Sequence, residues 1–199
     1  MIEGGGGEAP FTQRLRRSLA DVAWKKHNFI IRKIVDGEER EATSHEMDHV
    51  KKCVGGTLAL EIEWNNKAEF YDRDLENFKR LHQEGIFSVA ILVTRGRSFQ
   101  NSIEKLISDF IDLHNVTSFV DLEKFAGYDP SRKFRATIEA LIMERGLPFR
   151  EVWLRRFVVS KYASTTTHWA QLKNRLDRGI GNPCPMLLIG LPASIIDLT

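Results

Sequence analysis

The chain has 199 residues, of which 42% are hydrophobic and 28% charged, and its formal net charge is +2 at pH 7. These values are ordinary for a soluble globular protein, and the length suffices for one sizeable domain or at most two small ones. No apolar run is long enough to span a membrane, and the N-terminus lacks the basic-then-apolar layout of a signal peptide, so we expect no association with a membrane.

The cysteine content indicates a reducing compartment. The chain has two cysteines, Cys53 and Cys184, and neither belongs to a CxxC motif or to a Cys/His cluster. This pattern argues against a zinc site and fits a cytoplasmic protein. A single disulfide between the two thiols is also compatible with the sequence.

The N-terminus is rich in glycine. Residues 1–10, "MIEGGGGEAP", predict a flexible segment, or a tight turn against the core, because glycine restricts the backbone least. The same run is compatible with a truncated start. We expect residues 11–199 to form a single domain. It begins with a predicted amphipathic helix at 11–24, where apolar residues recur at helical spacing with arginines between them.

The segments that follow predict strands and helices in alternation. In chain order we expect a strand at 28–35, a turn at 36–39, strands at 40–50 and 57–64, a helix at 72–85 that Gly85 ends, a buried strand at 86–94 and a helix at 98–114. The C-terminal part predicts a helix at 132–146, a helix or strand at 150–162, a helix at 165–179 with a threonine cap, and a last buried strand at 184–192. This order favours an α/β fold with a mixed central β-sheet flanked by helices.

The stretch "LEIEWNNK" at 60–67 places two glutamates inside an otherwise apolar strand. Because side chains alternate along a strand, Glu61 and Glu63 share one face and the apolar residues share the other. Buried like charges are costly unless a partner neutralises them, and a bound cation is one such partner. The alternative is that both glutamates lie on an exposed strand face at the edge of the sheet.

A third carboxylate lies upstream. Asp48 is near the end of the preceding predicted strand, so antiparallel pairing brings it close to Glu61 and Glu63. Mg²⁺ prefers hard oxygen ligands, and it is commonly held by one or two carboxylates together with a substrate phosphate. An Asp followed by Glu-x-Glu or Glu-x-Lys on the next strand is the arrangement that holds magnesium in nucleases that cleave phosphodiesters, although the spacing also occurs by chance.

The segment "EMDHVKK…LALEIEWNNKAEFYDRDL" resembles the core of type II restriction endonucleases of the BglII/BstYI group, within the PD-(D/E)XK nuclease superfamily. The C-terminal "STTTHWAQLKNRLDRGIGNPCPMLLIGLP" resembles the end of such proteins. The resemblance implies a restriction-endonuclease-like core and Mg²⁺-dependent hydrolysis of double-stranded DNA at a short palindromic site, with RGATCY-like sites as the family expectation. Because a palindrome is read by a two-fold dimer, it also implies a homodimer.

The same resemblance implies roles for the carboxylates. Asp48 and Glu61 correspond to metal ligands. Glu63 stands where the superfamily more often has lysine and where BglII-like enzymes have glutamine, so it is a candidate third ligand or the group that positions or deprotonates the attacking water. Lys67 is a candidate replacement for the missing lysine.

Four other acidic residues have less specific interpretations. Glu46 shares the strand face of Asp48 but is expected to be exposed, and Glu8 precedes the first helix where such nucleases often place an additional acid. We expect Asp72 to be a helix N-cap and Asp74 to be a surface group of the first helical turn.

Candidate DNA contacts lie in two stretches. Asn65 and Asn66 follow the carboxylate strand, and they either reach DNA or turn the chain. The second stretch combines short polar side chains with a basic helix, a mixture that suits phosphates and base edges, or else it is an ordinary capped helix after a loop. Its candidates are Lys161, Ser164, Thr165, Thr166, Thr167, His168, Lys173 and Arg175.

Two other functions fit the same pattern. One is a non-specific or repair nuclease of the same fold, and the other is a DNA-binding protein whose carboxylates no longer act in catalysis.

Overall fold

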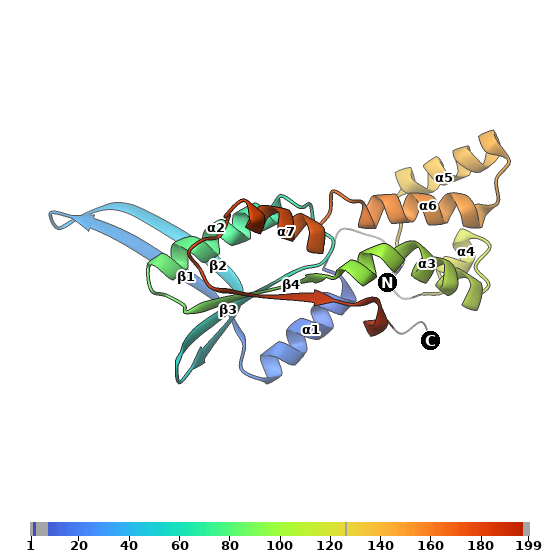
Figure 1. Ribbon diagram of the computed structural model, residues 1–199. Helices are drawn as coiled ribbons and strands as arrows, with labels where there is room; N and C mark the ends of the chain where they lie inside the picture. The colour runs from blue at the N-terminus through green and yellow to red at the C-terminus, as the bar shows by residue number, and fades with distance from the viewer. Residues whose placement is uncertain (1, 3–7, 126, 197–199) are drawn as a thin grey trace.

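The centre of the protein is a mixed five-stranded sheet, seen in a computed structural model that describes residues 2, 8–125 and 127–196 (Figure 1). The strands lie in the order β1 (Lys25–Val35), β2 (Glu38–Cys53), β3 (Gly56–Glu63), β4 (Val89–Arg95) and β5 (Met186–Leu191). The first three pair antiparallel, whereas β3, β4 and β5 pair parallel. The predicted α/β fold with a mixed sheet is therefore confirmed. The expected glycine segment falls mostly on residues outside those described.

Helices cover both faces of the sheet and one of its ends. Their bounds are α1 (Pro10–Asp21), α2 (Phe70–Gln83), α3 (Arg97–Leu113), α4 (Phe119–Leu122), α5 (Arg132–Arg145), α6 (Phe149–Tyr162), α7 (Trp169–Asp177) and the 3₁₀ turn η1 (Ala193–Ile195). Figure 1 shows α2 and α7 on one face, α1 on the other, and α3 to α6 grouped beyond one end of the sheet. In the described part of the chain, no helix is long and apolar enough to cross a membrane.

The alternation of side chains on β3 divides the core. Leu60 and Ile62 pack toward α1, while Ala59 belongs to the cluster under α2 and α7. Helix α2 contributes Leu75 and Phe78 to that cluster, and both are fully buried. The two glutamates have the same parity as Ala59, so they face α2.

Three local expectations change in the structure. Residues 150–162, for which helix and strand were both open, are helical. The last strand was expected to be buried, but β5 is an edge strand, and its Leu187 and Ile189 are exposed. The predicted threonine cap is wrong, because α7 begins at Trp169 and the His168 side chain accepts a hydrogen bond from the backbone N–H of Ala170.

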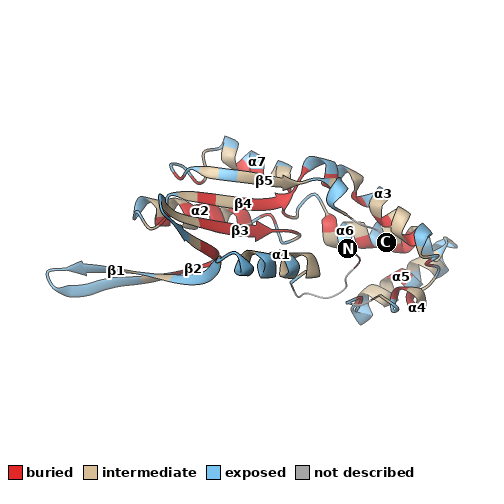
Figure 2. Ribbon diagram, turned by 90° about the horizontal axis from the view of Figure 1, so that it is seen from below, coloured by how far each residue is buried: buried red, intermediate tan, exposed pale blue. Residues whose placement is uncertain are grey.

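The β1–β2 hairpin extends beyond the rest of the sheet, and most of its residues are exposed (Figure 2). Asp36 and Gly37 both have positive φ at the turn, as a tight hairpin turn requires.

Both cysteines are free, with Cys53 exposed and Cys184 buried, so the possible disulfide does not form.

Candidate active site

The register of β2 and β3 brings the first two predicted carboxylates together. His49 pairs with Leu60 in an antiparallel ladder, so Asp48 lies beside Glu61. The backbone N–H of Asp48 donates a hydrogen bond of 3.1 Å to Oε1 of Glu61. The Asp48 carboxylate itself is 57% exposed and lies 3.9 Å from Nζ of Lys26. Asp48 thus holds Glu61 through its backbone and keeps its side chain accessible.

Glu61 and Glu63 are buried in the centre of the sheet. Their exposed fractions are 7% and 3%, and β3 lies between β2 and β4, so the alternative of an exposed edge strand is wrong. Burial, together with the negative charges of Asp48 and Asp74, raises the pKa of Glu61 to about 9. Burial and the Asp74 charge raise the pKa of Glu63 to about 8, against a hydrogen bond of 2.9 Å that Asn66 donates to it.

Helix α2 supplies a further buried carboxylate, and the prediction that Asp74 is a surface group is wrong. Its side chain is 3% exposed, and it faces Glu63 and Glu61 closely enough to raise the pKa of both. Oδ1 accepts hydrogen bonds from Nε and Nη2 of Arg73 at 2.9 and 2.8 Å. Oδ2 is buried without a hydrogen-bond partner among the described residues.

The sequence contained a signal for this burial. Asp74 lies four and seven residues before two buried positions of α2, a spacing that places all three on one helical face. The start of the helix was also misjudged: α2 begins at Phe70 after Glu69, so Asp72 is not the N-cap. Instead, Asp72 forms an ion pair with Arg175.

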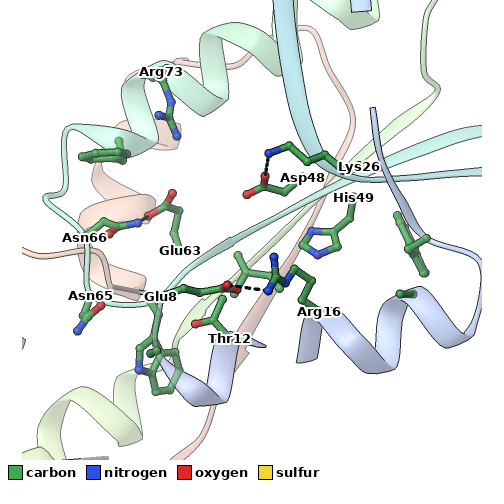
Figure 3. Close-up of a pocket in the computed structure, with 16 residues that line it drawn as sticks. Glu8, Thr12, Arg16, Lys26, Asp48, His49, Glu63, Asn65, Asn66 and Arg73 are labelled. Carbon is green, nitrogen blue, oxygen red and sulfur yellow. Dashed lines mark hydrogen bonds and ion pairs between the residues drawn. The ribbon is translucent and has the colours of Figure 1, made fainter. Parts of the chain in front are cut away.

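A cavity of about 440 Å³ opens between α1, the middle of β2, the end of β3 and the start of α2 (Figure 3). Three basic side chains and three acidic ones line it: Arg16, Lys26, Arg73, Glu8, Asp48 and Glu63. Arg16 and Glu8 form an ion pair of 3.1 Å. The cavity therefore exposes carboxylate and cationic groups side by side, as a site for a phosphodiester and a metal ion would require.

The fit of Mg²⁺ to this site can be judged from the donor set. Among the described residues, no group of three or more His, Cys, Asp or Glu side chains is arranged so that it could hold a metal ion. Mg²⁺ needs fewer protein ligands than that, because waters and substrate phosphates complete its coordination. A buried carboxylate such as Glu61, with a pKa of about 9 in the absence of a cation, gains a partner when a divalent ion binds. The donor chemistry thus fits Mg²⁺.

Lys67 and the two asparagines that follow the carboxylate strand differ in their position relative to the cavity. Lys67 is exposed, forms an isolated β-bridge with Thr166, and is not part of the cavity wall. Asn65 and Asn66 both line the cavity. The structure thus brings the asparagines, but not Lys67, to the carboxylates.

Several predicted DNA contacts face the protein interior. The guanidinium of Arg175 donates to both carboxylate oxygens of Asp72, at 2.9 and 3.0 Å. Thr167 is fully buried, and His168 is 8% exposed at the start of α7.

Lys173, in contrast, is about half exposed and pairs with Asp177. The remaining members of the stretch are Ser164 and Thr165, which are exposed, and Lys161 and Thr166, which are partly buried.

Arg95 is a residue that the sequence reasoning missed. It is fully buried at the end of β4, and burial lowers its pKa to about 10. Its guanidinium donates to the carbonyls of Trp64 and Thr167, each at 2.6 Å, and to the side chains of Gln100 and Thr166. Arg95 therefore ties the turn after the carboxylate strand to the segment before α7. The one feature of the sequence that could have indicated its burial was the position of this arginine at the end of a continuous apolar strand.

Comparison with known proteins identifies a family. A family model described as "Restriction endonuclease BglII/BglIII" matches residues 1–191. No curated protein and no solved structure matches the chain.

Proposed function

Since the chain belongs to the BglII/BglIII restriction endonuclease family, we propose that it hydrolyses double-stranded DNA at a short palindromic site, with Mg²⁺ and as a homodimer. Family membership makes it a type II restriction endonuclease, and therefore a site-specific deoxyribonuclease. The observation that carries the proposal is the pair of buried glutamates beside Asp48, since buried carboxylates without a cation are a cost that a purely structural strand avoids.

The residues divide the chemistry of phosphodiester hydrolysis among them. When bound, Mg²⁺ supplies positive charge that polarises the phosphoryl group and makes the attacking water more acidic. Asp48 and Glu61 are the residues that would hold it, together with waters and a substrate phosphate. Glu63 lines the cavity and accepts a hydrogen bond from Asn66, so its carboxylate is oriented to take a proton from the water.

A plasmid digest separates this proposal from its rivals. With Mg²⁺, a restriction endonuclease produces discrete bands, a non-specific or repair nuclease produces a smear, and a DNA-binding protein without activity leaves the plasmid intact. Cleavage that persists in EDTA would contradict the role of the divalent ion. The same digest, followed by end sequencing, maps the cleaved phosphate.

We expect Glu63→Gln to slow cleavage on the order of 10²-fold, because glutamine can orient a water but cannot accept its proton. Lys67→Ala should cleave within about twofold of wild type, because Lys67 does not line the cavity. Single-turnover rates at saturating Mg²⁺, measured across pH, check both variants. An active Glu63→Gln enzyme together with an inactive Lys67→Ala enzyme would transfer the role to Lys67.

Lys173→Ala and Arg175→Ala should differ in their effects on DNA binding. We expect Lys173→Ala to flatten the log–log salt dependence by about one unit, as the loss of one phosphate contact does. Arg175→Ala should leave that slope unchanged and lower the melting temperature, because it breaks the ion pair that the buried guanidinium forms with Asp72. Binding titrations in Ca²⁺ at several salt concentrations check the slopes. An unchanged slope for Lys173→Ala would remove α7 from the DNA interface.

A further inference from the structure

Arg73 is a basic side chain of the cavity that the mechanism above does not use. It projects from the first turn of α2, its side chain is 60% exposed, and Figure 3 shows it on the side of the cavity where Glu63 and Asn66 lie. Its Nε and Nη2 both donate to Oδ1 of Asp74, and its guanidinium lies 4.7 Å from the ring centre of Phe70. One edge of the group is thus held, while its other nitrogen, Nη1, has no hydrogen bond in the described part of the chain.

This arrangement differs from an ordinary surface ion pair. Exposed pairs are weak because two long side chains must be ordered, whereas here the acid is buried and the ring of Phe70 fixes the plane of the guanidinium. A guanidinium whose orientation is already set loses little entropy when it binds an oxyanion. Its remaining donors suit two oxygens of a phosphate.

The other two cations of the cavity are less suited to this task. Lys26 lies 2.6 Å from Glu46 and 3.9 Å from Asp48, so it bridges two exposed acids on the hairpin side. Arg16 is paired with Glu8. Arg73 lines the cavity on the side where Glu63 lies, so it is next to a carboxylate that the proposed reaction uses.

We propose that Arg73 binds the phosphate that is cleaved and that Asp74 is the positioning residue that orients it. The inference rests on the proposed function, because it assigns a group to the substrate of that reaction. Arg73 supplies the positive charge that a lysine at position 63 would otherwise provide next to the carboxylates. Arg73 then neutralises the charge that develops on the phosphoryl oxygens as the water attacks.

The first experiment compares Arg73→Gln with Arg80→Gln. Arg80 is an exposed arginine on the same helix, seven residues or about 10 Å further along, and it does not line the cavity. We expect Arg73→Gln to lower the single-turnover rate on the order of 10²-fold and Arg73→Lys to recover part of it, while Arg80→Gln stays within about twofold of wild type. Equal rates for the two glutamine variants would overturn the proposal.

A second experiment tests the contact itself, with a binding readout. A duplex with a neutral methylphosphonate at the mapped cleavage phosphate is titrated in Ca²⁺ against wild type and Arg73→Gln. If Arg73 contacts this phosphate, the change in affinity caused by neutralising it should be about tenfold smaller in the variant. The same change in both proteins would show that Arg73 does not touch that phosphate.

The positioning role of Asp74 is tested in the same assay. Asp74→Asn should slow cleavage in the wild-type background and add little to Arg73→Gln, because its effect passes through Arg73. A full additional loss in the Arg73→Gln background would overturn that role. If wild type itself does not cut DNA with Mg²⁺, the proposed function fails and this inference fails with it; if wild type cuts and Arg73→Gln cuts equally well, the inference alone fails.

Discussion

Glu61→Gln is expected to lose cleavage by a factor on the order of 10³ while the protein stays folded. Glutamine keeps the size of the side chain and can still accept the hydrogen bond from the Asp48 backbone, but it cannot carry the negative charge that holds a divalent cation. Single-turnover cleavage of plasmid DNA at saturating Mg²⁺ measures the loss, and circular dichroism checks the fold. A Glu61→Gln enzyme that cuts at the wild-type rate would contradict the assignment of Glu61.

The same variant should change how stability depends on pH. The pKa of Glu61 is about 9 in the folded protein and about 4.5 in the unfolded chain, so between these values the folded state holds a proton that the unfolded state has released. The unfolded state therefore binds fewer protons, and the free energy of unfolding falls as pH rises, by about 1.4 kcal/mol per pH unit for this carboxyl. Glu63 adds a similar fall up to its pKa of about 8.

Thermal melts without divalent cations between pH 5 and pH 9 check this slope. Wild type should lose stability toward pH 9, and Glu61→Gln should lose less because glutamine does not titrate. Divalent cations should restore more stability to wild type at pH 8 than at pH 5, since they favour the ionised carboxylates. If the melting temperatures of wild type and Glu61→Gln depend on pH in the same way, Glu61 is not buried without a neutralising positive charge.

Arg95→Met is expected to lower the free energy of unfolding by about 3–5 kcal/mol. Methionine fills similar space but donates no hydrogen bonds, so the carbonyls of Trp64 and Thr167 lose their shared donor inside the protein. Chemical denaturation measures the change. Arg97→Met, at an exposed position two residues away, is the matched control and should change stability by less than about 0.5 kcal/mol.

Loss of Arg95 should also reduce activity under conditions where the variant is still folded. Trp64 directly follows Glu63, so the carbonyl that Arg95 binds belongs to the turn that carries the two asparagines of the cavity. Cleavage assays at low temperature, with folding verified by circular dichroism, separate this effect from unfolding. Full activity in folded Arg95→Met would show that the turn keeps its position without the arginine.

The main carboxylates could be predicted because their placement depends on local rules. The period of a strand puts Glu61 and Glu63 on one face, and the short connection between β2 and β3 makes the strands antiparallel neighbours, which brings Asp48 to Glu61. The α/β class followed in the same way from alternating strand and helix patterns. Resemblance to a family then supplied the role that we propose for these carboxylates, which spacing alone could not.

Tertiary structure decided which other charged residues are internal. From the sequence, Arg175 is expected to be a surface arginine of a basic helix, but in the structure it pairs with Asp72, 103 residues away in the chain. Arg95 binds Thr167, 72 residues away, and Asp74 is buried because it lies on the apolar face of α2 that packs against the sheet. A charged side chain can be buried where distant segments supply its partners, and the composition of its own segment carries no record of those partners. The sequence alone therefore determined the position of the carboxylate strand, whereas the packing of α2 and α7 on the sheet determined which charges surround it.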